Sequence, residues 1–104
     1  MRYTLHVPLT FNNGEPVPDV VHDYVRDQLH QITTGWTELV ATGHWTLDSG
    51  DAVDEPMRLF IIDKVGQNDQ VLGMLSTLAH TVKNLANQES VYLTAQPIAT
   101  YYIK

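Results

Sequence analysis

Cysteine is absent from this chain of 104 residues. Disulfide frameworks, thiolate zinc sites and cysteine nucleophiles are therefore excluded, and the absence fits a reducing compartment. The apolar residues nowhere form a run close to the roughly 20 residues that span a bilayer. The N-terminal segment carries one charge and alternates in polarity, unlike a signal peptide. We therefore predict a soluble, cytoplasmic protein that does not associate with membranes.

Basic residues are scarce. Six lysines and arginines stand against twelve aspartates and glutamates, which gives a formal net charge of −6. Nucleic-acid binding needs clustered positive charge, so this balance argues against a nucleic-acid partner. The acidic balance favours solubility and is compatible with a basic protein partner.

Motifs of established chemistry are also missing. No serine lies in a Gly-x-Ser-x-Gly context, and no Gly-Lys-Ser or Gly-Lys-Thr marks a phosphate-binding loop. No two of the five histidines have the i, i+4 spacing of a metalloprotease helix. The sequence therefore predicts no cofactor and no metal ion.

The chain has the size and apolar content of one globular domain, 1–104, since 43% of its residues are hydrophobic. Alternating polarity predicts strands, and apolar residues at helical spacing predict helices. Asn68 or Asp69 is the expected N-cap of the second helix. The expected strands are 3–9, 36–47 with an interruption at Thr42-Gly43, 52–63, 90–96 and 98–103, and the expected helices are 18–34 and 66–87.

The order β-α-β-β-α-β, with an extra C-terminal strand, predicts an α+β fold of the ferredoxin-like type. In that arrangement two helices pack on one face of an antiparallel sheet. Residues 57–62 form the most apolar run and are expected to be a central strand. The first helix is expected to bury a stripe made of Val20, Val21, Tyr24, Val25, Leu29 and Ile32.

Several short motifs stand out over roughly residues 15–95, namely Gly35-Trp36-Thr37, Gly43-His44-Trp45, Gly50, Glu55 and Gln88-Glu89-Ser90-Val91. They resemble a family of small bacterial proteins of unknown function, which shows Gly-x-Thr, Gly-x-Trp, a glycine turn, a glutamate and Gln-x-x-Val. The resemblance implies a ferredoxin-like α+β domain and implies no activity.

The stretch Thr34–Glu55 contains both tryptophans and is the first place to look for a site. Trp36 and Trp45 could stack on a planar ligand, but burial beside the bend of the second strand is the favoured interpretation. Glu55 stands where a strand should become buried. It could titrate as a general acid or base, or accept a hydrogen bond from the Trp45 indole, and we favour the structural role.

His6 and His44, on neighbouring strands, are the candidates for a site assembled with Glu55, although packed or solvated histidines are the simpler interpretation. Asp48, Asp51, Asp54 and Glu55 lack the spacing of a calcium loop and indicate a solvated turn. The sheet face away from the helices should pair with another subunit or line a ligand cleft. That face is expected to carry Thr4, His6, His44, Thr46, Arg58 and either Tyr92 or Tyr102.

These features favour a small binding or accessory module, not an enzyme, that self-associates as a homodimer. One alternative is a small cofactor-free enzyme with a cleft at the 43–55 bend, in which Glu55 or His44 transfers protons. A second alternative is an acidic, inhibitor-like protein that binds a basic partner. Trp36, Trp45, His6 and Arg58 are the candidate ligand-binding residues.

Overall fold

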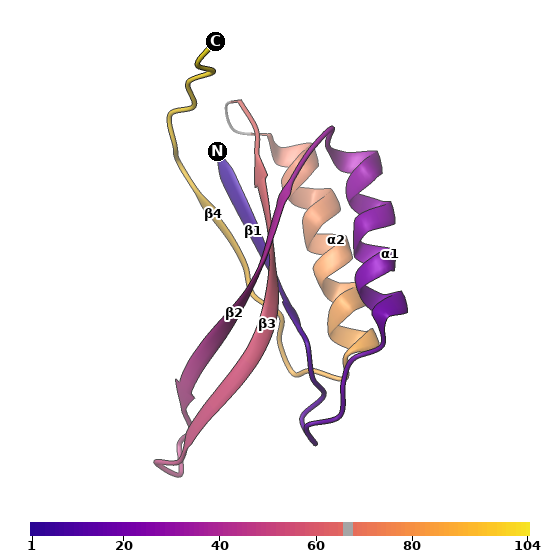
Figure 1. Ribbon diagram of the computed structural model, residues 1–104, viewed down its shortest axis with the longest axis vertical. Helices are drawn as coiled ribbons and strands as arrows, with labels where there is room; N and C mark the ends of the chain where they lie inside the picture. Colours follow the sequence, from indigo (N-terminus) through magenta and orange to yellow (C-terminus); the bar gives the residue numbers. More distant parts are fainter. Residues whose placement is uncertain (66–67) are drawn as a thin grey trace.

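The computed structural model describes residues 1–65 and 68–104. Four strands form one antiparallel sheet in the order β2-β3-β1-β4. Both helices cover the same face of this sheet (Figure 1), an α+β architecture that fits the predicted ferredoxin-like fold. In chain order the elements are β1 (Arg2–Pro8), α1 (Asp19–Ile32), β2 (Thr37–Thr46), β3 (Ala52–Asp63), α2 (Asp69–Leu85) and β4 (Leu93–Gln96).

The helix ends follow local chemistry. Pro18 precedes α1 with φ of −58°, the value that its ring imposes and that suits a helix start. The Asn68 side chain accepts a hydrogen bond from the Val71 amide at 3.1 Å, which confirms the expected N-cap of α2. Gly66 and Gln67, which the sequence placed at the opening of this helix, lie outside the described residues.

Two hydrophobic clusters hold the layers together. The main core lies between the sheet and the helices, where β1 contributes every second side chain. A second core, made of Val17, Val21 and Ala86 with Phe11 against it, joins the loop after β1 to both helices. The main core consists of Tyr3, Leu5, Val7, Val25, Leu29, Phe60, Ile62, Val71, Leu75, Leu78, Ala79 and Val82.

The buried stripe of α1 differs from the prediction at its edge. Val20, expected inside, is 68% exposed, whereas His22 is only 3% exposed. Val20 and His22 flank the central line of Val21, Val25 and Leu29 on opposite sides. At the roughly 100° per residue of an α-helix, His22 lies about 60° from the middle of that line and Val20 about 140°. Helical geometry therefore already favours burial of the histidine, and the prediction erred because it selected residues for hydrophobicity.

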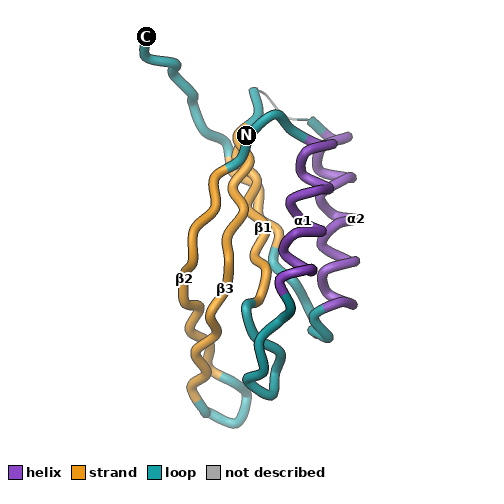
Figure 2. The backbone as a smooth tube through the Cα atoms, turned by 45° about the vertical axis from the view of Figure 1, so that its right-hand side comes forward, coloured by secondary structure: helices purple, strands orange, loops and turns teal. Residues whose placement is uncertain are grey.

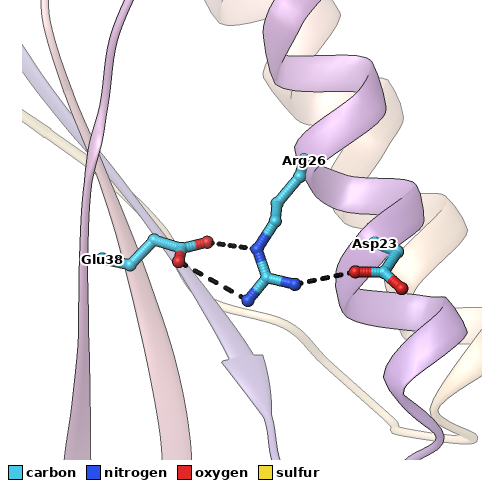
Figure 3. A network of polar contacts seen from close by, with 3 residues as sticks. All are labelled: Asp23, Arg26 and Glu38. Carbon is cyan, nitrogen blue, oxygen red and sulfur yellow. Dashed lines mark hydrogen bonds and ion pairs between the residues drawn. The ribbon is translucent and has the colours of Figure 1, made fainter.

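An ion-pair network joins α1 to the edge strand β2. Figure 3 shows the Arg26 guanidinium between the carboxylates of Asp23 and Glu38. Arg26 Nε donates to Glu38 Oε1 at 2.7 Å, and Nη1 donates to Asp23 Oδ1 at 2.9 Å. The contact ties the helix layer to a strand that otherwise pairs only with β3.

The second strand runs through Thr42 and Gly43 without the predicted interruption. Gly43 pairs with Glu55 across the ladder. A side chain at this position would lie 2.7 Å from the Met57 methyl carbon and 3.3 Å from the Trp45 ring. The glycine therefore leaves room for the Met57 and Trp45 side chains inside a continuous strand. The long β2–β3 hairpin extends past the ends of the helices (Figure 1).

The strand predicted over 98–103 is absent, and β4 is shorter than the predicted 90–96. Gln96 pairs with Arg2, the first residue of β1, so the chain beyond it has no strand to pair with. The segment instead extends away from the sheet (Figure 2). Across the described parts of the chain, no helix is long and apolar enough to cross a membrane.

Candidate functional site

A pocket of about 300 Å³ opens on the sheet face that the helices leave uncovered. His6 and Pro8 of β1, together with Trp45 of β2, form part of its wall. Glu55 and Met57 of β3 and residues 88–92, which connect α2 to β4, complete most of the lining. The pocket thus gathers side chains from three strands and from a connection distant in sequence.

The β2–β3 register brings Trp45 and Glu55 together. Gly43 is the partner of Glu55, and Trp45 is two residues further along the same face, within reach of the carboxylate. The indole Nε1 donates to Glu55 Oε2 at 3.1 Å. The predicted hydrogen bond between these two residues is therefore present, and Glu55 also lines the pocket.

Three rings form an aromatic corner at the pocket. The Trp45 and Tyr92 centroids are 5.4 Å apart with planes inclined at 41°, and His6 meets Tyr92 edge-on at 5.8 Å. Trp45 is 37% exposed and Tyr92 is 56% exposed. Both large rings therefore retain surface on which a planar ligand could stack.

The pocket is electrostatically negative. Burial lowers the pKa of His6, whose Nδ1 lies 3.4 Å from the Met57 sulfur, so this imidazole is neutral at pH 7. Glu55 and Glu89 contribute carboxylates to the lining, and neither lysine nor arginine is among the described lining residues. Such a pocket favours a ligand that carries positive charge.

The other candidate residues lie elsewhere. Trp36 packs edge-on against His30 beyond the end of α1, with ring centroids 4.7 Å apart. His44 Nδ1 contacts Asp54 Oδ1 at 2.7 Å, and both side chains are more than 70% exposed. The Nε of Arg58 is buried near His22.

Placing His44, Thr46 and Arg58 on the open sheet face was therefore wrong. Arg58 is two residues from Phe60, which belongs to the main core, so both point toward the helix side of β3. The ladder partners of Arg58 and Asp54 are Val40 and His44, which consequently lie on that side as well. Alternation along a strand divides its side chains between two faces, but it does not say which face points toward the helices until the buried residues are known.

The carboxylates of the acidic turn do not converge on a common point. Asp48 and Asp51 are exposed in the hairpin loop, and Ser49 donates to Asp51 at 3.0 Å. Within residues 1–65 and 68–104, no group of three or more histidines and carboxylates is placed to hold a metal ion.

Tyr92 and Met57 are pocket residues that the sequence analysis did not select as ligand-binding candidates. The alternation around 90–96 did suggest that Tyr92 faces away from the core. The segment Gln88-Glu89-Ser90-Val91 was noticed only as a motif, yet all four of its residues line the pocket together with Trp45 and Glu55. Three pieces of the motif set thus converge at one place in the fold.

The chain matches no protein-family model and no curated protein sequence. Its structure is similar to that of a phage SAM lyase in complex with S-methyl-5′-thioadenosine, with 24% identity and a TM-score of 0.65. That match covers 88% of this chain and 76% of the lyase chain. A phage SAM lyase in the apo state matches with 22% identity and a TM-score of 0.63, covering 88% and 75%. At these identities the likeness concerns the fold, and the resemblance to small bacterial proteins stays a prediction.

Proposed function

We propose that the chain is a small lyase that binds S-adenosylmethionine in this pocket and cleaves it to S-methyl-5′-thioadenosine. The observation that carries the proposal is the joint placement of Trp45, Tyr92 and Glu55 in a negative pocket, on a fold similar to that of phage SAM lyase. The proposal develops the alternative of a small cofactor-free enzyme at the 43–55 bend.

The pocket chemistry suits a sulfonium nucleoside. The exposed faces of Trp45 and Tyr92 suit an adenine ring, and aromatic faces also attract a cationic centre. Glu55 holds the indole through one carboxylate oxygen, so its charge can face the sulfonium. Asn12 and Ser90 supply polar groups for ribose hydroxyls. The pocket volume lies at the lower end of the range for small-molecule sites, about 300–1,000 Å³.

The reaction breaks the bond between sulfur and the aminocarboxypropyl chain, because S-methyl-5′-thioadenosine retains the methyl and adenosyl groups. Sulfur takes the bonding electron pair and becomes neutral. The freed carbon chain either loses a proton to a base, for which Glu55 is the pocket candidate, or forms a new C–O bond to its own carboxylate. The first route gives an unsaturated amino acid and the second gives a lactone. Neither route consumes water, a metal ion or a redox cofactor.

The loss of charge during cleavage makes a test available. Tryptophan fluorescence after rapid mixing, recorded before turnover, should show that the wild type binds S-adenosylmethionine more tightly than the neutral S-methyl-5′-thioadenosine. In Glu55→Gln the amide can still accept the indole hydrogen bond but lacks the charge. Its affinity for S-adenosylmethionine should fall about tenfold, equivalent to about 1.4 kcal/mol, with little change for the thioether.

His44→Gln is the matched control, because His44 is exposed outside the pocket. It should bind and cleave like the wild type. Chromatography of the products would separate the lactone from the unsaturated amino acid. Failure of the wild type to bind either nucleoside, or an equal loss for both nucleosides in Glu55→Gln, would contradict the proposal.

Self-association is a second proposal, supported by the apolar character of the open sheet face. Leu39 is 43% exposed there, and its ladder partner Leu59 is half-buried beside it. Ile61 follows on the same face of β3. We propose that copies of the chain meet through this face, for which a two-fold dimer is the simplest closed form.

A further inference from the structure

One histidine is buried without any of the partners that buried polar groups normally have. His22 is 3% exposed, and neither ring nitrogen has a hydrogen-bond partner among the described residues. The Nε of Arg58 is buried and unpartnered in the same sense. Buried polar atoms usually have hydrogen-bond partners. The unpartnered nitrogens of His22 on α1 and Arg58 on β3 therefore make this contact between helix and sheet a weak point of the fold.

The charges that act on His22 come from two elements, and a third element contributes through Arg26. Arg58 approaches from β3, while Arg26, Asp19 and Asp23 share α1 with the histidine. Glu38 of β2 is engaged by Arg26. Burial lowers the pKa of His22, and Arg58 and Arg26 lower it further against the opposing effect of the two aspartates. The imidazole is therefore neutral in the folded protein at pH 7.

Two backbone hydrogen bonds link the loop after β1, which packs against α1, to the part of β3 that runs past the pocket. The Leu9 amide donates to Pro56 O at 3.0 Å, and the Val17 amide donates to Leu9 O at 2.9 Å. Val17 then packs with Val21, the neighbour of His22, in the second core. Pro56 lies on β3 between Glu55 and Met57, which line the pocket, and two residues before Arg58. The loop that packs against α1 is therefore bonded to β3 beside both the pocket and Arg58.

Both pocket loops rest on this second core. Phe11 precedes Asn12, and Ala86 lies two residues before Gln88. Asn12 and Gln88 line the pocket. The second core, which contains the neighbour of His22, thus contacts both loops at positions that do not include Trp45 or Glu55.

We propose that His22 is an acid-sensitive latch: its protonation beside Arg58 and Arg26 loosens α1 from the sheet and, through the second core, displaces the two loops that line the pocket. That this change regulates the pocket rests on the proposed function, whereas the structural change itself does not. The latch is closed at neutral pH and opens in acid.

The direction follows from proton linkage. The unfolded chain takes up a proton at His22 near its ordinary pKa of about 6.5, whereas the folded protein resists it. The contribution to stability is thus present above that value and is lost as pH falls toward the lowered pKa of the folded state. For this one group, the unfolding equilibrium constant should rise by at most about tenfold per pH unit.

The test compares proteins that all carry His6→Gln, so that the pocket imidazole cannot contribute. Urea unfolding and backbone amide NMR are followed from neutral pH into acid without any ligand. The parent should lose stability below the ordinary histidine pKa, and the Asn12 and Gln88 amides should shift with the same midpoint as the His22 ring. His22→Leu should abolish the shared midpoint and remove the part of the stability loss that begins near the ordinary histidine pKa.

His22→Phe is a second variant without a titratable ring, for use if leucine packs poorly. His80→Gln, at an exposed position on α2, should behave like the parent. A His22 midpoint at or above 6.5, or pocket amides that ignore its titration, would overturn the proposal. Because no nucleoside is present, a failure of S-adenosylmethionine binding has no bearing on this outcome.

Discussion

At the scale of single residues, the tightest constraint is the contact between Gly43, Met57 and Trp45. Gly43→Ala would place its new methyl 2.7 Å from the Met57 side chain and 3.3 Å from the indole. The methionine end can move, but the indole is held by Glu55. We expect a loss of about 1–2 kcal/mol in the free energy of unfolding, measured with urea.

Gly35→Ala is the matched control, because nothing lies within 4 Å of a methyl there. Its unfolding free energy should change by less than about 0.5 kcal/mol. The indole fluorescence of Gly43→Ala should also change if Trp45 is displaced. Equal effects of the two substitutions would mean that the close contact is not a constraint.

The site was predictable to the extent that it depends on adjacent strands. Trp45 and Glu55 flank one hairpin, so their contact follows from local pairing. His6 reached the correct face because alternation in β1 is unambiguous. Arg58 and His44 were misplaced because a polar residue in an apolar run can face either the helices or the solvent. Tyr92 depends on a long-range contact with β1, which no local pattern specifies.

At the scale of elements, the Arg26–Glu38 pair fastens α1 to β2. Burial raises the pKa of Glu38, but the hydrogen bonds and charge of Arg26 outweigh that effect, with help from Trp36 and Arg58. The pKa therefore lies below its ordinary value. The stabilisation is present above the ordinary value and is lost as pH falls through the lowered one.

Arg26→Met keeps the aliphatic stem and removes the charge. Because the Arg26 and Glu38 side chains are only 30% and 26% exposed, we expect a loss of about 1–2 kcal/mol at pH 7. Urea unfolding should show this difference shrinking in acid. Arg2→Met, which breaks a more exposed pair with Asp63, should cost less stability than Arg26→Met, because solvent screens the exposed pair. Equal losses for both variants would contradict the special weight given to the α1–β2 bridge.

Helices and strands were predictable where one period dominates. The long β3 and the capped α2 followed from local sequence, as did the central position of the most apolar run. The prediction of a terminal strand was wrong because a segment with alternating polarity forms a strand only where a partner strand is available. The Ile98–Ile103 segment has the pattern, but β1 begins at Arg2, which already pairs with Gln96, and the Met1 backbone bonds to Lys64 instead.

At the scale of the whole molecule, the open sheet face and the net charge of −6 act in opposite directions. The apolar side chains on that face favour association, whereas like-charged copies repel. Salt screens the repulsion, so self-association should strengthen as ionic strength rises. Sedimentation velocity at micromolar concentration, at low and high salt, measures this response directly.

Leu39→Glu would place a further negative charge on the open face. It should shift the protein toward monomer at every salt concentration, because the charge would be buried between copies without a partner. Val20→Glu adds the same charge at a site on α1 that is 68% exposed and lies on the helix layer, so its association should stay near that of the wild type. Equal weakening by both substitutions would attribute association to net charge alone, and a wild type that sediments as a monomer under all conditions would remove the proposed interface. If the contrast holds, the same face that carries the pocket also joins the copies, so ligand binding should shift the sedimentation profile of the wild type.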